Sequence, residues 1–172
     1  KELRSFPYHE NVFGDLKFDV IRFDYNENRT SIGLQSQRHP EFPRTVAIPL
    51  NGKFQSVAFL LAATHGVDGE KAMTMRFDYE DGTSAEVPIR VGREIGDWML
   101  ARNPEGMMRH CVWRTADGKQ GVFLYEWDNP ESQKVLSQVE LLSANPQSQP
   151  LVAGVTAVPS RFQKTYDHAV CM

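Results

Sequence analysis

Two Asp-Gly pairs, Asp81-Gly82 and Asp117-Gly118, constrain the fold of this chain most, because each lies between two strand-like segments. An Asp-Gly pair readily takes the positive backbone φ that a tight hairpin turn requires. In the segment Glu70–Tyr79, before the first turn, large apolar side chains occupy every second position, which is the pattern of a half-buried strand. The sequence therefore predicts antiparallel strands joined by hairpins.

Most of the remaining chain also has the character of strands, and helical periodicity is weak, with one turn at most in Ile95–Leu100. About ten short strands separated by turn signals predict an all-β fold, an antiparallel β-sandwich of jelly-roll type. The predicted strands are Lys17–Arg22, Thr30–Ser36, Thr45–Leu50, Phe54–Thr64, Glu70–Tyr79, Thr83–Arg90, Arg109–Thr115, Lys119–Trp127, Lys134–Ala144 and Leu151–Val158.

A single domain is expected, because 172 residues can bury a hydrophobic core without covalent cross-links. The predicted sandwich covers residues 17–158, and residues 159–172 form a C-terminal extension. Residues 1–16 hold aromatic side chains without periodicity, and they are either a linker from a preceding domain or an arm packed on the sandwich. Lys1 is neither an initiator Met nor the start of a signal-peptide pattern, so we expect a mature fragment or an excised domain.

Composition argues against several functions. The net charge of −3 gives no general attraction to nucleic acid or to an anionic membrane, and no apolar run approaches the roughly 20 residues that span a bilayer. Nucleophile elbows, phosphate-binding glycine loops and dinucleotide fingerprints are missing from the sequence. Cys111 and Cys171 lack metal-site spacing, and whether they pair stays open.

The connections between strands predict where a site lies. In an antiparallel sandwich, successive connections alternate between the two ends, provided that every strand crosses the body. Function on β scaffolds is usually carried by the longer loops, so we expect the site at the end with loops rich in His, Arg, Asp and Asn. The short-turn end would hold Asp24–Arg29, Asn51–Lys53, Glu80–Gly82, Ala116–Gly118 and Asn145–Pro150. The site end would hold Gln37–Arg44, His65–Gly69, Val91–Met108 and Asp128–Gln133.

Several motifs, taken in order, resemble one known family. Together they are similar to the jelly-roll, galactose-binding-domain-like accessory modules of bacterial glycoside hydrolases and related carbohydrate-active enzymes. The motifs are Phe18–Ile21, Val46–Leu50, Val57–Ala63, Phe77–Thr83, Val87–Gly92, Asp97-Trp98, Leu124–Pro130 and Gly154–Thr156.

The resemblance implies a secreted, noncatalytic module, extracellular or periplasmic, that is carbohydrate-binding or structural and needs no cofactor. Its partners would be a polysaccharide or oligosaccharide and the catalytic domain of the parent enzyme. Where related modules carry a second aromatic residue after the Asp-Trp pair, this chain has Met99, which weakens the transfer of an aromatic platform.

Trp98 is the first candidate ligand-binding residue. Sugars stack their C–H faces on aromatic rings while polar side chains bind the hydroxyls, and Arg93, Asp97 and Asn103 lie near Trp98 in the chain. The alternative interpretation is that Trp98 closes the end of the core and Asp97 caps a short turn. Under the binding interpretation, Trp98→Ala would abolish glycan retention without changing stability. Trp113 and Trp127 lie in strand-like runs and are assigned to packing.

His39 and His65 are further candidates at the predicted site end, where histidines could serve as ligand or base. Surface histidines without a chemical role are the alternative, because no carboxylate is tied to either by spacing. Asp24, Asn26 and Asn28 resemble the start of a calcium loop, but Arg29 stands where such a loop needs Gly. A structural calcium site there stays open beside a simple polar turn.

Two rival functions remain open. A structural module would order a neighbouring catalytic domain and expose an apolar patch, formed by Phe6, Tyr8 and Phe13, once it is excised. A polysaccharide lyase or hydrolase would require turnover that depends on His39 or His65. We expect no enzyme, because the sequence offers no assembled acid–base set.

Overall fold

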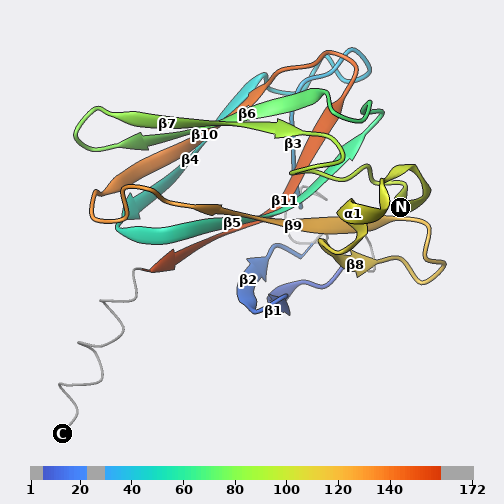
Figure 1. The fold of residues 1–172 in the computed structure, drawn as a ribbon, viewed down its shortest axis with the longest axis horizontal. Helices are drawn as coiled ribbons and strands as arrows, with labels where there is room; N and C mark the ends of the chain where they lie inside the picture. The colour runs from blue at the N-terminus through green and yellow to red at the C-terminus, as the bar shows by residue number, and fades with distance from the viewer. Residues whose placement is uncertain (1–5, 23–29, 160–172) are drawn as a thin grey trace, which may run out of the picture.

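A computed structural model of the chain describes residues 6–22 and 30–159. Two antiparallel sheets pack face to face, so the predicted antiparallel β-sandwich is confirmed (Figure 1). One sheet has the order β4 (Thr45–Gly52), β10 (Leu136–Ser143), β6 (Lys71–Tyr79) and β7 (Ser84–Arg90). The other has the order β3 (Ile32–Gly33), β11 (Gln149–Pro159), β5 (Phe54–Thr64), β9 (Gly121–Asp128) and β8 (Cys111–Arg114).

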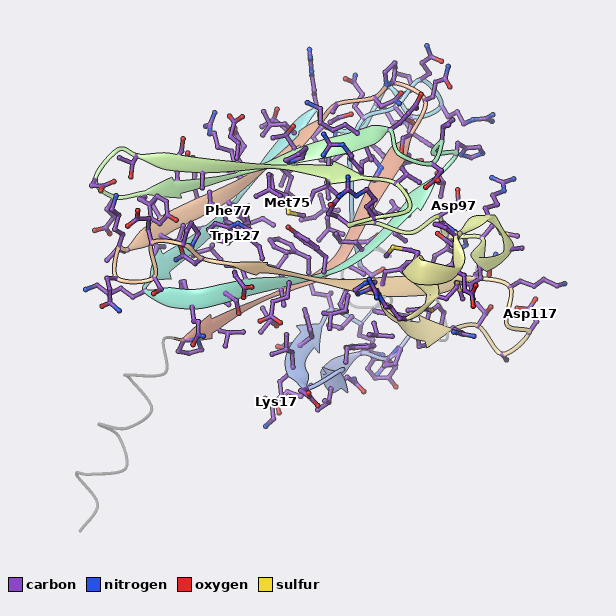
Figure 2. The ribbon with its side chains drawn as sticks, in the orientation of Figure 1. Lys17, Met75, Phe77, Asp97, Asp117 and Trp127 are labelled. Atoms are coloured by element: carbon purple, nitrogen blue, oxygen red, sulfur yellow. The ribbon has the colours of Figure 1, made fainter. Side chains whose placement is uncertain are left out.

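The main core lies between the two sheets. Met73, Met75 and Phe77 of β6 point inward and are fully buried, as the alternating pattern predicts. Trp127 of β9 stacks on Phe77 with ring centroids 3.6 Å apart, and Figure 2 shows both rings between the sheets. The assignment of Trp127 to packing is therefore confirmed.

Strand β5 is buried on both faces, which explains its unbroken apolar sequence. Phe59 faces the main core, whereas Leu60 faces a second cluster on the outer side of the sheet. That cluster is covered by a hairpin of β1 (His9–Phe13) and β2 (Leu16–Val20), which lies below the five-stranded sheet in Figure 1. Residues 6–16 thus pack on the sandwich as an arm, although the sequence showed no strand there.

The segment after β7 differs from its predicted helical turn. Residues 96–99 are not helical: Asp97 forms a bridge with Ala63 near the end of β5, and Met99 forms one with Gln120, which precedes β9. Ala63 accepts a hydrogen bond from Trp98 N–H, and Trp98 accepts one from Gly121 N–H. A Cβ on Gly96 would lie 2.3 Å from the Phe123 ring, so only glycine allows this approach. Helical backbone follows only in η2 (Leu100–Arg102) and α1 (Glu105–Met108).

The sandwich has two unlike ends. The left-hand end in Figure 1, called the turn end, has the connections 51–53, 80–83 and 129–135. The right-hand end, called the loop end, has the connections 34–44, 65–70, 91–110, 115–120 and 144–148.

Three connections lie at the end opposite to the one predicted. Strand β8 has only four residues, and it pairs with the first residues of β9 without crossing the body. The alternation therefore fails at β8 and stays reversed afterwards. The turn around Asp117 and the connection 144–148 belong to the loop end, whereas 129–135 belongs to the turn end. Figure 2 shows Asp117 at the same end as Asp97.

Candidate functional site

A polar hollow of about 220 Å³ opens at the loop end. Three connections supply its lining: Gln37 and Arg38 come from the first, His65 from the second and Gln147 from the third. All four side chains are exposed and polar. Amide and guanidinium groups of this kind donate hydrogen bonds to hydroxyl or acid oxygens, so the hollow can bind a polar ligand.

A second hollow of about 320 Å³ adjoins the first, and Gln37 lines both. The guanidinium-bearing Arg44 is its charged member. Its full lining is Gln35, Ser36, Gln37, Pro40, Arg44, Ser143, Ala144, Asn145 and Pro146. The two hollows together form the candidate site, which we call the Gln37 site.

Backbone and side-chain hydrogen bonds fix the walls of the Gln37 site. Gln37 N–H donates to the Pro146 carbonyl at 2.6 Å, which ties the first connection to the last. Asn145 donates through Nδ2 to the Glu70 carboxylate at 2.5 Å and accepts from Gln147 N–H at 2.8 Å. The three connections are thus held together independently of any ligand.

His65 has a left-handed backbone, with φ of 59°. Such a conformation is uncommon for a residue other than glycine and persists where the surroundings impose it. The next residue, Gly66, has no space for a side chain, because a Cβ there would lie 2.6 Å from Val91. The loop is therefore confined on its inner side while His65 lines the hollow.

Trp98 lies in the core, as the alternative interpretation had it. Only 9% of the residue is exposed, and its ring stacks on Trp113 with centroids 6.1 Å apart. It belongs to the outer cluster beneath the β1–β2 hairpin. A sugar has no open ring face to stack on here, so we assign Trp98 to packing.

Asp97 and Asn103 brace the long connection. Asn103 accepts from Asp97 N–H at 2.6 Å and donates to the Asp97 carbonyl at 2.8 Å. The Asp97 carboxylate accepts from Met99 N–H at 2.8 Å, as a capping group would. Burial raises the pKa of the Asp97 carboxyl, opposed by the Met99 hydrogen bond and by the nearby Arg102 and His65 charges.

Arg93 and His39 line neither hollow of the Gln37 site. The Arg93 side chain is 68% exposed, and its guanidinium is 4.0 Å from the Glu94 carboxylate. His39 stacks on Phe42 with centroids 5.0 Å apart and lies 2.9 Å from the Glu41 carboxylate. Of the six predicted site residues, only His65 lines either hollow, and it lines the first.

Within the described residues, two buried polar atoms at the loop end, Asp97 Oδ2 and Ser148 Oγ, have no hydrogen-bond partner. The Arg102 guanidinium lies 3.9 Å from Asp97 Oδ2. Ser148 is completely buried and follows Gln147 of the hollow in the chain. A buried polar atom without a hydrogen bond destabilises the fold. The hydrogen-bonding groups of the loop end are therefore incompletely satisfied within the described residues.

Metal ligands are not gathered in the described part of the chain, where no group of three His, Cys, Asp or Glu could hold an ion. The string Asp24, Asn26 and Asn28 lies outside the described residues, so the calcium alternative stays a prediction. Cys111 is free, and its thiol donates to the Trp113 carbonyl at 3.3 Å, while Cys171 lies outside the described residues. Within 6–22 and 30–159, no helix has the length and apolar character needed to cross a bilayer.

The sequence did not single out Gln37, Arg38, Arg44 or Gln147. The connection Gln37–Arg44 was placed at the correct end, but its Gln and Arg side chains carry no motif. Gln147 was assigned to the opposite end by the count that failed at β8. If β8 had been recognised as too short to cross the sandwich, the count of connections would have placed Gln147 at the loop end.

Comparison of the chain with protein-family models, with curated proteins and with solved structures gave no match. The resemblance to carbohydrate-binding accessory modules therefore stays a prediction.

Proposed function

We propose that this protein is a noncatalytic carbohydrate-binding module that recognises a glycan through the Gln37 site. The observation that carries the proposal is the pair of adjoining hollows, lined by amide and guanidinium side chains at the loop end of a β-sandwich. Such groups match the hydroxyl-rich surface of a sugar, and their spacing over three connections gives orientation.

The composition of the Gln37 site favours binding over turnover. His65 is the only histidine in the two linings, and no carboxylate lines either hollow. General acid–base cleavage of a glycosidic bond requires a pair of such groups. A lyase or hydrolase at this place would therefore need residues that the described lining does not supply.

The proposal includes the setting that the sequence resemblance implies, a secreted polysaccharide-degrading enzyme outside the bacterial cytoplasm. Both hollows are open and lack an aromatic platform, so single-site affinity would be weak. Tethering to a catalytic domain would raise the effective concentration of the module at its substrate. The parent catalytic domain and the polysaccharide are thus the proposed partners.

A polysaccharide-affinity screen of the purified chain tests the proposal, run with calcium and again with a chelator. We expect retention on a defined glycan under both conditions, and loss of retention in Gln37→Ala. That variant keeps the backbone hydrogen bond to Pro146 and removes only the side chain between the hollows. The matched control is Gln133→Ala, an exposed Gln at the turn end. Equal loss in both variants would contradict the assignment.

A structural accessory role is the second candidate, and one observation favours it. A third hollow of about 390 Å³ is lined mainly by apolar side chains, including Ile21, which is 55% exposed. The patch predicted from the N-terminal aromatics is not its basis, because Phe6 and Phe13 are buried within this chain and only Tyr8 is exposed. Absence of glycan retention together with tight binding to the catalytic domain would support this role.

A further inference from the structure

The Gln37 site carries positive charge without a compensating acid. Arg38 and His65 line the first hollow, Arg44 lines the second, and neither lining contains Asp or Glu. The chain as a whole has 22 acidic and 19 basic residues, so this local composition runs against the net charge. A surface that gathers cations in an acidic protein favours an anionic ligand.

Two carboxylates on the connections that form the site, Glu41 and Glu70, have hydrogen-bond partners of their own, and Asp68, also on the second connection, lines neither hollow. Glu41 pairs with His39, and that hydrogen bond lowers the pKa of the Glu41 carboxyl. Glu70 accepts from Asn145 at 2.5 Å, on the wall of the second hollow. Among residues 6–22 and 30–159, no carboxylate forms an ion pair with Arg38 or Arg44. Both guanidinium groups are therefore available to a ligand.

Asp97 interacts electrostatically with His65, but it lines neither hollow. Its carboxylate is 3% exposed and accepts from Met99 N–H. The exposed guanidinium of Arg102 lies 3.9 Å from Asp97 Oδ2. The Asp97 carboxylate is therefore buried at the loop end and is not part of the lining of either hollow.

Arginine is suited to acid groups on a sugar. Its planar guanidinium presents paired N–H donors that match the two oxygens of a carboxylate or the oxygens of a sulfate ester. We propose that the ligand of the Gln37 site is an anionic glycan, whose carboxylate or sulfate groups are bound by Arg38 and Arg44. This inference rests on the proposed carbohydrate-binding function and names the class of glycan.

The test uses glycans that differ in charge alone. Polygalacturonate is compared with its methyl ester, and dextran sulfate with dextran, by affinity electrophoresis or calorimetry on the intact chain. We expect binding to at least one anionic polymer, with at least tenfold weaker binding to its neutral counterpart. Binding to polygalacturonate alone would assign a carboxylate, and binding to dextran sulfate alone would assign a sulfate.

A pair of double variants with the same change in net charge separates a site from general attraction. R38A/R44A should weaken binding at least tenfold, whereas K53A/R114A, which removes two exposed cations outside both hollows, should change it less than twofold. A second pair, R38K/R44K, keeps the charge and should still weaken binding, because Lys lacks the guanidinium fork. Thermal unfolding establishes that each variant is folded.

The possible results distinguish failure of the anionic-glycan inference from failure of the proposed carbohydrate-binding function. Equal weakening by both alanine pairs would show nonspecific electrostatics and overturn the inference. Binding to neutral and anionic polymers alike, lost in Gln37→Ala, would overturn it while leaving carbohydrate binding in place. If the protein is retained on none of these polymers and on none in the wider screen, both the anionic-glycan inference and the carbohydrate-binding function are overturned. Should R38A/R44A not fold, undiminished binding by R38K/R44K would refute the arginine assignment.

Discussion

The two ends of the sandwich treat their polar groups differently. At the turn end, Asn129 accepts from the Tyr79 hydroxyl at 2.6 Å and from Glu131 N–H at 3.0 Å, and donates to the Phe54 carbonyl at 2.8 Å. Asp81 accepts twice from Thr83 and lies 3.0 Å from Lys134. Each of these groups has its partner within the chain.

At the loop end, polar groups are left over. Asp97 Oδ2 and Ser148 Oγ are buried without a hydrogen-bond partner, and His65 holds a left-handed backbone. Arg38 and Arg44 line two hollows whose linings contain no Asp or Glu. At the turn end, polar groups are paired within the fold. At the loop end, some donors and acceptors have no partner among the described residues. Strain and unpaired groups of this kind concentrate at functional sites.

The substitution with the greatest predicted loss of stability tests whether Trp98 belongs to the core or to the surface of the loop end. Trp98→Ala should lower the free energy of unfolding by about 3–5 kcal/mol, because it removes a buried aromatic from the outer cluster. Urea unfolding measures the loss, with Val67→Ala, exposed at the same end, as a control near zero. An unchanged midpoint for Trp98→Ala would return Trp98 to the surface and to the sugar-stacking interpretation.

A smaller effect tests the satisfied network at the turn end. Asn129→Ala should cost about 1–3 kcal/mol, because it leaves the buried Tyr79 hydroxyl without its acceptor. Asn145→Ala at the loop end should cost less, since its partners Glu70 and Gln147 are exposed to water. Chemical denaturation of both variants makes the comparison, and equal losses would remove the distinction between the ends.

The ionisation of Asp97 should make the protein less stable as pH rises, because this carboxyl is buried and only partly hydrogen-bonded. Its folded pKa is raised, so protonated Asp97 stabilises the fold below the unfolded value of about 3.9, and that stability is lost as pH rises through the folded pKa. Asp97→Asn keeps an acceptor for Met99 N–H and cannot ionise. Wild type should therefore lose stability relative to Asp97→Asn as pH increases above about 4. A difference that is independent of pH would contradict the assigned burial effect.

Asp81 should show the opposite sign and the smallest effect, because it is exposed. Hydrogen bonds from Thr83 and the interaction with Lys134 lower the pKa of Asp81 to about 2. Its contribution is present above the unfolded value of about 3.9 and is lost as pH falls toward 2. Acid titration of stability should thus bring wild type and Asp81→Asn together between pH 4 and pH 2. Convergence at higher pH instead would argue against this network.

Local pattern predicted the strands better than it predicted their arrangement. The bounds of β5 agree with the prediction, because apolar β-branched and aromatic runs end at clear turn signals. Strand β1 was missed, although its partner β2 was predicted as Lys17–Arg22, because the pairing and the surrounding aromatic cluster become apparent only in three dimensions. The jelly-roll type was a finer prediction than the antiparallel sandwich that the structure supports.

The site was harder to predict than the fold, for two physical reasons. A strand of four residues gives little periodic signal, and the error at β8 moved the connection 144–148 to the wrong end. Aromatic character also drew attention to Trp98, whose burial depends on a hairpin more than 70 residues earlier in the chain. The arginines of the Gln37 site have no motif, and the Gln37–Pro146 hydrogen bond that joins their connection to 144–148 exists only in the folded chain.

The most direct test of the difference between the two ends is an NMR titration of backbone amides. Oligogalacturonate and a sulfated dextran oligosaccharide would be added in turn to the isotope-labelled chain. We predict the largest chemical-shift changes in residues 35–44, 65–70 and 143–148, with the turn-end connections 51–53, 80–83 and 129–135 unchanged. Changes centred on the turn end, or saturable binding that leaves the Gln37 site unmoved, would contradict the account.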